Sequence, residues 1–267
     1  MKDGLREAQR AVGRAERRQE AEQHERTQGA ARRAAIRRTR DLRALPRWRR
    51  FLVENGLTLV STALFLVTLV GLVLTGAATH NAEQRDHGQQ TLSVAGYLRS
   101  GAFLEAVAEN WESEFLQMGV LVVLTAMLYQ RGSAESKHIE EPEAADADPR
   151  EARDDPEAPW PVRVGGAALA VYRHSLSIAL FALFAISFAL HAVGGAREFS
   201  EQQVAHGGQP VTSLQYLASS RFWFESLQNW QSEFMSVAVL VLLTVWLREQ
   251  GSAQSKPVAA SSGETGH

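Results

Sequence analysis

The chain has no cysteine among its 267 residues, which removes two kinds of site at once. Without thiols the chain forms no disulfides and binds no metal through thiolates. The sequence also lacks a Gly-rich phosphate loop, the HExxH pair of zinc peptidases and the GxSxG turn of hydrolases. We therefore expect no enzyme activity, no cofactor and no metal.

Charge is also absent from long stretches of the chain. Residues 57–79 contain no charged side chain and would span roughly 34 Å as a helix, more than a hydrocarbon core of about 30 Å. Residues 175–193 form a similar run, with one histidine, His191, near its end. Two shorter runs, 115–128 and 234–247, have 14 residues each and taken alone would fit the core of a soluble bundle.

The residues upstream of the short runs favour membrane helices. Phe103, Val107, Trp111 and Phe115 recur every four residues and therefore share one helical face. Trp111 and its counterpart Trp230 lie where aromatic belts meet the membrane surface. We predict four transmembrane helices, which cover about residues 57–79, 110–130, 173–194 and 229–249.

Basic residues are distributed unevenly around the predicted spans. Residues 1–50 hold 16 Lys and Arg against 7 Asp and Glu, whereas the loops 80–101 and 194–220 carry three Arg between them. Because cytoplasmic segments carry the excess of Lys and Arg, we predict a multi-pass protein of the bacterial inner (plasma) membrane with both termini in the cytoplasm. The first apolar run begins only near Leu57, so the start of the chain does not have the pattern of a secretory signal.

The basic residues next to the spans also predict a partner. They fit contact with anionic lipid headgroups, and beside a membrane span lipid is the expected partner of the Arg-rich start rather than nucleic acid. The residues predicted to contact headgroups are Arg47, Arg49, Arg50, Lys137 and Lys256.

The chain contains a tandem duplication. Residues 76–137 and 195–256 align without a gap and share 26 identities over 62 positions, including an NW-SEF motif and a GSA-SK motif. Each copy contains two spans, so we expect both copies to have the same orientation about a pseudo-two-fold axis along the membrane normal. The predicted organisation is an Arg-rich cytoplasmic extension, helical or disordered, at 1–46, a first repeat at 47–137, an acidic cytoplasmic linker at 138–165, a second repeat at 166–256 and a disordered tail at 257–267.

These motifs resemble an uncharacterised bacterial membrane-protein family, a domain of unknown function whose members carry the NWQSEF and GS-SK pair. The resemblance covers about residues 47–260, and members start close to the RRFL-ENGL stretch, here Arg49–Leu57. The first 46 residues depart from that pattern. The resemblance implies a four-helix integral membrane protein with no assigned activity, and it supplies no catalytic residues.

The repeated motifs place polar residues inside two spans. Glu114 and Glu233 lie roughly one helical turn inside the outer membrane boundary. In one hypothesis the polar residues of the second predicted span face those of the fourth. Together they line a small cavity in which the two Glu bind a proton or cation. In the other, which we favour, each Glu is an interfacial anchor bonded to Ser, Asn or a loop donor such as His87. The candidate polar site comprises Asn110, Ser113, Glu114 and Thr125 with their counterparts Asn229, Ser232, Glu233 and Thr244.

Other repeated residues have local structural interpretations. His87 and His206 are predicted to structure the outer loops rather than to bind a metal, because the His and Glu near the first are not duplicated. The remaining predictions concern backbone geometry: unusual backbone angles at Gly88 and Gly207, helix N-caps at Ser100 and Ser219, and helix C-caps at Gly132 and Gly251.

The sequence therefore predicts an all-α membrane protein with four transmembrane helices, arranged as two parallel tandem helical-hairpin repeats. The second and fourth helices are expected to be long and partly amphipathic. The favoured function is a non-enzymatic structural or interaction protein of the bacterial envelope, embedded in the lipid bilayer. The alternative is a small transporter or proton/cation pathway that uses Glu114 and Glu233. A transporter of this size usually has more than four spans, so this alternative carries the expectation of a homo-oligomer.

Overall fold

A computed structural model describes residues 44–138 and 143–266, and every regular element in these ranges is helical. The all-α prediction is confirmed for this part of the chain. The extension predicted at 1–46 lies outside the described residues up to position 43. The chain divides into two compact units, one that ends at Gly71 and one that begins at Leu72.

The first unit contains α2 (Arg47–Glu54) and the first half of α3 (Gly56–Asp86). The arginines predicted to contact lipid headgroups, Arg47, Arg49 and Arg50, are exposed on α2. The most apolar stretch of α3 has none of its residues buried. A long helix whose apolar side chains remain uncovered suits a lipid environment, where exposed apolar surface is not disfavoured.

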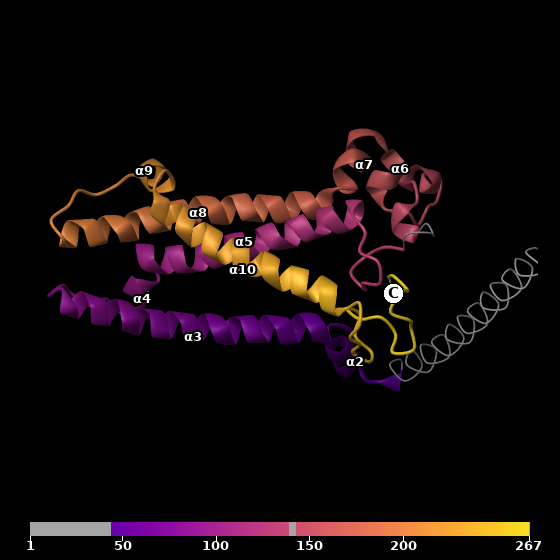
Figure 1. Cartoon of the computed structure of the whole chain (residues 1–267), viewed down its shortest axis with the longest axis horizontal. Coiled ribbons are helices and arrows are strands. Elements are labelled where there is room, and N and C mark those ends of the chain that lie inside the picture. The colour runs from indigo at the N-terminus through magenta and orange to yellow at the C-terminus, as the bar shows by residue number, and fades with distance from the viewer. Residues whose placement is uncertain (1–43, 139–142, 267) are drawn as a thin grey trace, which may run out of the picture. The chain divides into compact units, whose positions relative to one another are not determined.

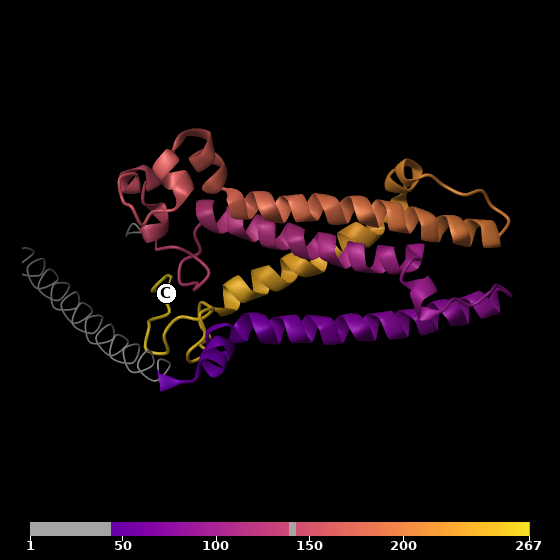
Figure 2. The ribbon, with the colours of Figure 1, turned by 180° about the vertical axis from the view of Figure 1, so that it is seen from behind.

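Three long helices form the body of the second unit. α5 (Gly101–Met127) packs along α8 (Ser175–Ala205), and α10 (Ser220–Leu243) packs against α5. Figures 1 and 2 show α5 and α8 side by side over most of their length. They are antiparallel, because Gly101 at the start of α5 meets Glu198 near the end of α8, whereas Gly119 meets Phe181.

Short helices connect the long ones. The first predicted outer loop contains α4 (Val94–Tyr97) and the second contains α9 (Ser213–Leu217), which packs on α8. The acidic linker contains two 3-10 turns, at Ala144–Asp146 and Pro149–Ala152, and continues into α6 (Trp160–Val164) and α7 (Gly166–Tyr172).

Two of the four predicted spans correspond to helices that are long and apolar enough to cross a membrane. These helices are α3 and α8, each of 31 residues. α5 and α10 have polar and charged residues in their first halves, so their crossing stays a prediction. α5 has 27 residues, which corresponds to roughly 40 Å and is sufficient in length for a membrane.

The helix starts agree with the sequence, but two helix ends do not. Ser100 and Ser219 are confirmed as N-caps, since their hydroxyls accept from the N–H of Phe103 and Phe222 at 3.2 and 3.3 Å. The predicted C-caps are wrong, because α5 ends at Met127 and α10 at Leu243, several residues before Gly132 and Gly251. Leu128 leaves the helix with extended backbone angles, and the two glycines adopt positive φ in the loops that follow.

Several local contacts recur at positions 119 residues apart. Tyr97 packs on Gly76, and Tyr216 packs on Gly195, so closely that a Cβ on either glycine would lie within 2.3 Å of the tyrosine ring or hydroxyl. Gly88 and Gly207 both have positive φ, of 66° and 78°, as the sequence predicts.

The loop after each second helix is also alike in the two copies. Ser136 Oγ accepts from the N–H of Gln130 at 2.9 Å, and Ser255 Oγ accepts from that of Glu249 at the same distance. The residues predicted as a disordered tail return toward these loops, where Thr265 Oγ1 accepts from the N–H of Gly132.

The two lysines predicted to contact headgroups have protein partners here. Lys137 Nζ is 2.5 Å from Asp146 Oδ1 in the acidic linker. Lys256 is 1% exposed, and its Nζ lies within hydrogen-bond distance of three backbone carbonyls. These carbonyls belong to Ser261, Ser262 and Glu264.

Candidate functional site

Five ionisable side chains lie buried or half-buried between α5, α8 and α10. They are Glu105, Glu109 and Glu112 of α5, His191 of α8 and Glu225 of α10, and we call them the acid–histidine cluster. Glu112 and His191 have no exposed side-chain surface. Because an isolated charge in an apolar interior is strongly disfavoured, such groups must be paired, protonated or bound to an ion.

α5 supplies its three carboxylates from one face. Residues 105, 109 and 112 are spaced by four and three positions, which brings them onto the same side of a helix. α8 approaches this face closely at Gly194, where an added Cβ would lie 2.6 Å from the backbone nitrogen of Glu105. The glycine therefore allows the backbones of α5 and α8 to approach at the level of the cluster.

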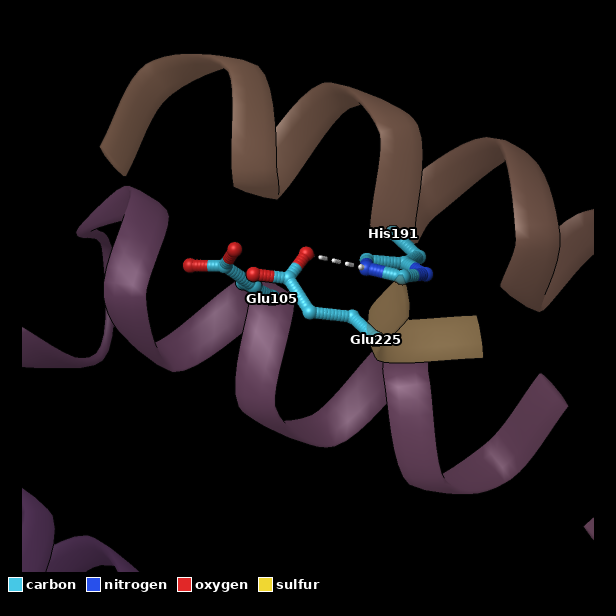
Figure 3. Close-up of side chains that lie close together, drawn as sticks. All are labelled: Glu105, His191 and Glu225. Carbon is cyan, nitrogen blue, oxygen red and sulfur yellow. Dashed lines mark ion pairs between the residues drawn. The ribbon is translucent and has the colours of Figure 1, made fainter. Parts of the chain in front are cut away.

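His191 links two helices through its ring. Its Nδ1 is 3.1 Å from Glu112 Oε2, and the other oxygen of Glu112 accepts from Trp230 Nε1 at 3.2 Å. Its Nε2 has no hydrogen-bond partner in the part of the chain that the structure describes, and Glu225 Oε2 lies 3.6 Å away. Figure 3 shows the imidazole directed toward the Glu225 carboxylate, with Glu105 beyond it.

Tyr216 of α9 joins the two carboxylates on that side. Its hydroxyl is 2.9 Å from Glu105 Oε1, and it also contacts Glu225 Oε2. Burial, together with these two carboxylates, raises the pKa of Tyr216, so the phenol stays protonated at neutral pH. Arg221 Nε donates to the remaining oxygen of Glu225 at 2.8 Å.

One phenolic proton cannot satisfy two carboxylates fully. Arg221 already balances the charge of Glu225, so the charge that remains to be balanced is that of Glu105. A proton on its carboxyl or a metal ion would balance it. Burial raises the pKa of Glu105, which precedes the predicted span 110–130, to about 7. Glu105 can thus take up a proton near neutral pH.

Aromatic rings enclose the cluster from one side. Phe222 has no exposed surface and stacks on the His191 ring at a centroid distance of 4.6 Å. Phe188 contacts Phe222 edge to face at 5.1 Å, and Tyr216 does so at 5.6 Å. These rings fix the imidazole and keep water away from it, which strengthens electrostatic interactions inside.

The equivalent place in the first copy is a cavity. A pocket of about 290 Å³ is lined by Leu72, Ala102 and Ala106, which stand 119 positions before His191, Arg221 and Glu225. Its lining also includes Gly76 and Tyr97, the counterparts of Gly195 and Tyr216. His191, Arg221 and Glu225 of the second copy thus correspond to small or apolar side chains in the first.

The polar residues predicted from the repeated motifs lie mainly along their own helices. Ser113, Ser232 and Thr125 donate their hydroxyls to carbonyls three or four residues earlier, and Asn110 Nδ2 donates to the carbonyl of Ala106. Such bonds satisfy the side chain without any partner from another helix.

The remaining predicted residues reach other parts of the unit. Glu114 is exposed and Glu233 half-buried, and the two are close enough to interact electrostatically. Asn229 belongs to the edge of the cluster, since its Nδ2 donates to Glu109. Thr244 bonds Ser133 at 2.8 Å near the end of α10. Their role as an ion site stays a prediction.

The outer-loop histidines lie together. The rings of His87 and His206 are 5.4 Å apart, and each Nδ1 contacts the backbone carbonyl four residues earlier. Both side chains are exposed. This arrangement agrees with a structural role in the loops.

Reasoning from the sequence named none of the five cluster residues as site residues, because it selected residues shared by both copies. The counterparts of Glu105, Glu109 and Glu112 are Phe224, Gln228 and Gln231. A usable signal was nevertheless present: three Glu at helical spacing beside an apolar run, and a single His within another. The asymmetric residues, not the repeated ones, make the site.

The chain belongs to the DUF6766 family, a domain of unknown function whose sequence model matches residues 48–267. The match begins within α2 and includes every long helix of the described structure. It confirms the resemblance to a domain of unknown function that the NW-SEF and GS-SK motifs suggested. No curated protein and no solved structure shows significant similarity to the chain.

Proposed function

We propose that the chain is a multi-pass integral membrane protein that holds a cation in the acid–histidine cluster, as part of a proton or metal-ion pathway. The observation that supports this most directly is the complete burial of Glu112 and His191 beside further carboxylates. Ionisable residues at membrane depth are disfavoured unless they serve an ion or a partner charge. We therefore propose that the ion pathway uses the acid–histidine cluster instead of Glu114 and Glu233.

The proposed topology is four spans in a bacterial plasma membrane, formed by α3, α5, α8 and α10 after a tandem duplication. α5 lies antiparallel along α8, so a membrane crossed by α8 would be crossed by α5 as well. The recurring contacts 119 residues apart support the duplication. With both termini in the cytoplasm, His191 would lie about one helical turn inside the outer boundary of its span.

We propose binding rather than covalent chemistry at the cluster. His191 has no exposed side-chain surface and is covered by Phe222, so an organic substrate would have to displace packed rings to reach it. A bare ion needs little room. The burial therefore favours an ion over a metabolite, in keeping with the expectation of no enzyme activity.

Flux measurements in proteoliposomes test the pathway. The purified chain would be reconstituted with indicators for H⁺, Na⁺, K⁺ and Mn²⁺ inside the vesicles. We expect flux of one of these ions, reduced at least tenfold by Glu225→Gln. The matched control is Glu114→Gln, a carboxylate outside the cluster, which should leave the flux unchanged. A wild-type chain that passes none of these ions would reject the pathway.

A structural role is the second candidate, and one observation favours it. The cluster joins α5 of the first predicted repeat to α8 and α10 of the second, through His191–Glu112 and Trp230–Glu112 contacts. A cluster whose only role is to hold the fold together would connect these helices in the same way. In that case Glu225→Gln would lower the stability of the folded protein, and the wild type would show no flux above that of empty vesicles.

A further inference from the structure

We propose that Glu105, His191 and Glu225 form a binding site for one divalent transition-metal ion, such as Zn²⁺ or Mn²⁺. This inference deepens the proposed function, because it names the class of ion that the cluster holds. A nitrogen of His191 and one carboxylate oxygen from each Glu lie within 4.8 Å of one another. Figure 3 shows the three side chains coming from three helices, with the Glu225 carboxylate between His191 and Glu105.

The spacing of the donor atoms suits such an ion. Zinc binds nitrogen and oxygen at about 2.0–2.2 Å in tetrahedral sites, so its ligand atoms lie roughly 3.3–3.5 Å apart. His191 Nε2 and Glu225 Oε2 are 3.6 Å apart, which is too long for a hydrogen bond but close to that separation. An ion could bridge these two atoms with little movement of either helix.

The bonding state of His191 is an independent sign of a ligand. The side chain is fully buried, and Nε2 has no hydrogen-bond partner among the described residues. Glu112 accepts at Nδ1, which places a proton there and leaves the lone pair of a neutral imidazole on Nε2. That lone pair faces the Glu225 carboxylate, an arrangement that is repulsive unless Nε2 carries a proton or a metal ion lies between the two atoms.

The surroundings of the three residues resemble the supporting contacts of metal sites. Histidine ligands commonly donate their other ring nitrogen to a carboxylate, as His191 does to Glu112. Arg221 binds Glu225 Oε1, and Oε2 lies between the Tyr216 hydroxyl and the histidine. The Tyr216 hydroxyl holds Glu105 Oε1 at 2.9 Å. Each donor is therefore oriented by a group outside the set.

The donor set also limits the kind of metal. One imidazole nitrogen with two carboxylates suits Zn²⁺, Mn²⁺, Fe²⁺ or Co²⁺. Ca²⁺ takes six to eight oxygen ligands, and Mg²⁺ demands a near-ideal octahedron and keeps several waters. The packed rings of Phe222 and Tyr216 leave little room for either arrangement beside His191.

Equilibrium metal binding tests the site. The full-length chain, purified in mild detergent with a tag that lacks histidine, would be stripped with EDTA and titrated separately with Zn²⁺, Mn²⁺, Mg²⁺ and Ca²⁺ by isothermal calorimetry. We expect one Zn²⁺ or Mn²⁺ per chain and no comparable binding of Mg²⁺ or Ca²⁺. His191→Ala should weaken binding at least 100-fold, and Glu112→Gln should weaken it about 10- to 100-fold through its effect on the imidazole.

The control addresses the two exposed histidines of the outer loops. His87→Gln with His206→Gln removes the pair in the outer loops and should leave binding unchanged. Size-exclusion profiles and helical circular dichroism would establish that each variant is folded. If His191→Ala does not fold, the decisive measurement is the visible absorption spectrum of Co²⁺ added to the wild type. A site with nitrogen and oxygen ligands should give the absorption bands of low-symmetry Co²⁺.

Three results would overturn the proposal. They are a wild-type chain that binds no transition metal, binding that is lost in the His87 and His206 double variant, and binding that persists in a folded His191→Ala variant. Absent metal binding together with proton flux would reject the metal site and leave the proposed pathway intact. Metal binding without flux would support the site and reject the pathway.

Discussion

Glu112 of α5 and His191 of α8 form a hydrogen bond of 3.1 Å, although they are 79 positions apart and have no exposed side-chain surface. The same carboxylate accepts from Trp230 of α10 at 3.2 Å. One side chain therefore connects three helices at a level where water is excluded. Removing it leaves two buried donors without an acceptor.

We expect Glu112→Ala to lower the free energy of unfolding by about 3–5 kcal/mol, the typical effect of breaking a buried charged pair. Unfolding of the detergent-solubilised protein by heat or SDS measures it. Glu114→Ala is the matched control, because Glu114 is exposed on the same helix two residues later. Its effect should stay within about 0.5 kcal/mol. Equal effects of the two substitutions would contradict the central position of Glu112.

The two tyrosines that pack on glycine offer a second comparison. Tyr216→Phe removes the hydroxyl shared by Glu105 and Glu225, and we expect a loss of about 1–3 kcal/mol because buried acceptors remain unsatisfied. Tyr97→Phe removes the same atom beside a cavity lined by Ala102 and Ala106. There we expect a loss below about 1 kcal/mol. A larger effect at Tyr97 would count against a special role for the cluster.

The helical architecture could be predicted from the sequence because its determinants are local. Long apolar runs, serine N-caps and glycines in turns each act within a few residues. Ser100, Ser219, Gly88 and Gly207 therefore have their expected geometry. The ends of α5 and α10 were harder, because Leu128 leaves the helix for a loop that is held by contacts with distant residues such as Thr265.

The site could not be predicted in the same way, because it depends on which helices meet. Glu105 and His191 come together only through the antiparallel packing of α5 on α8, and neither is shared by the two copies. The repeated Glu114 and Glu233 drew attention because repetition is visible in a sequence. Differences between the copies are equally visible in a sequence. For example, Ala106 of the first copy corresponds to Glu225 of the second.

The closeness of α5 and α8 depends on Gly194. A methyl group at this position would lie 2.6 Å from the nitrogen of Glu105 and 3.0 Å from the carbonyl carbon of Leu104, both backbone atoms that cannot rotate away. We expect Gly194→Ala to lower the free energy of unfolding by about 1–3 kcal/mol. Gly71→Ala is the control, because an added Cβ there meets nothing within 4 Å. Gly71→Ala should be neutral or stabilising in the helix, and an equally harmless Gly194→Ala would contradict the packing.

The absence of cysteine allows the topology to be tested without preparatory mutations. Single cysteines would be introduced at four exposed positions: Gln89, Glu157, Gln209 and Gln254. A membrane-impermeant maleimide should label positions 89 and 209 in intact spheroplasts, and positions 157 and 254 only after permeabilisation. The physical reason is that, in the proposed topology, α5 and α10 would each carry the chain across the bilayer. If α5 instead lay along the membrane surface, positions 89 and 157 would be labelled from the same side, and the four-span arrangement would be wrong.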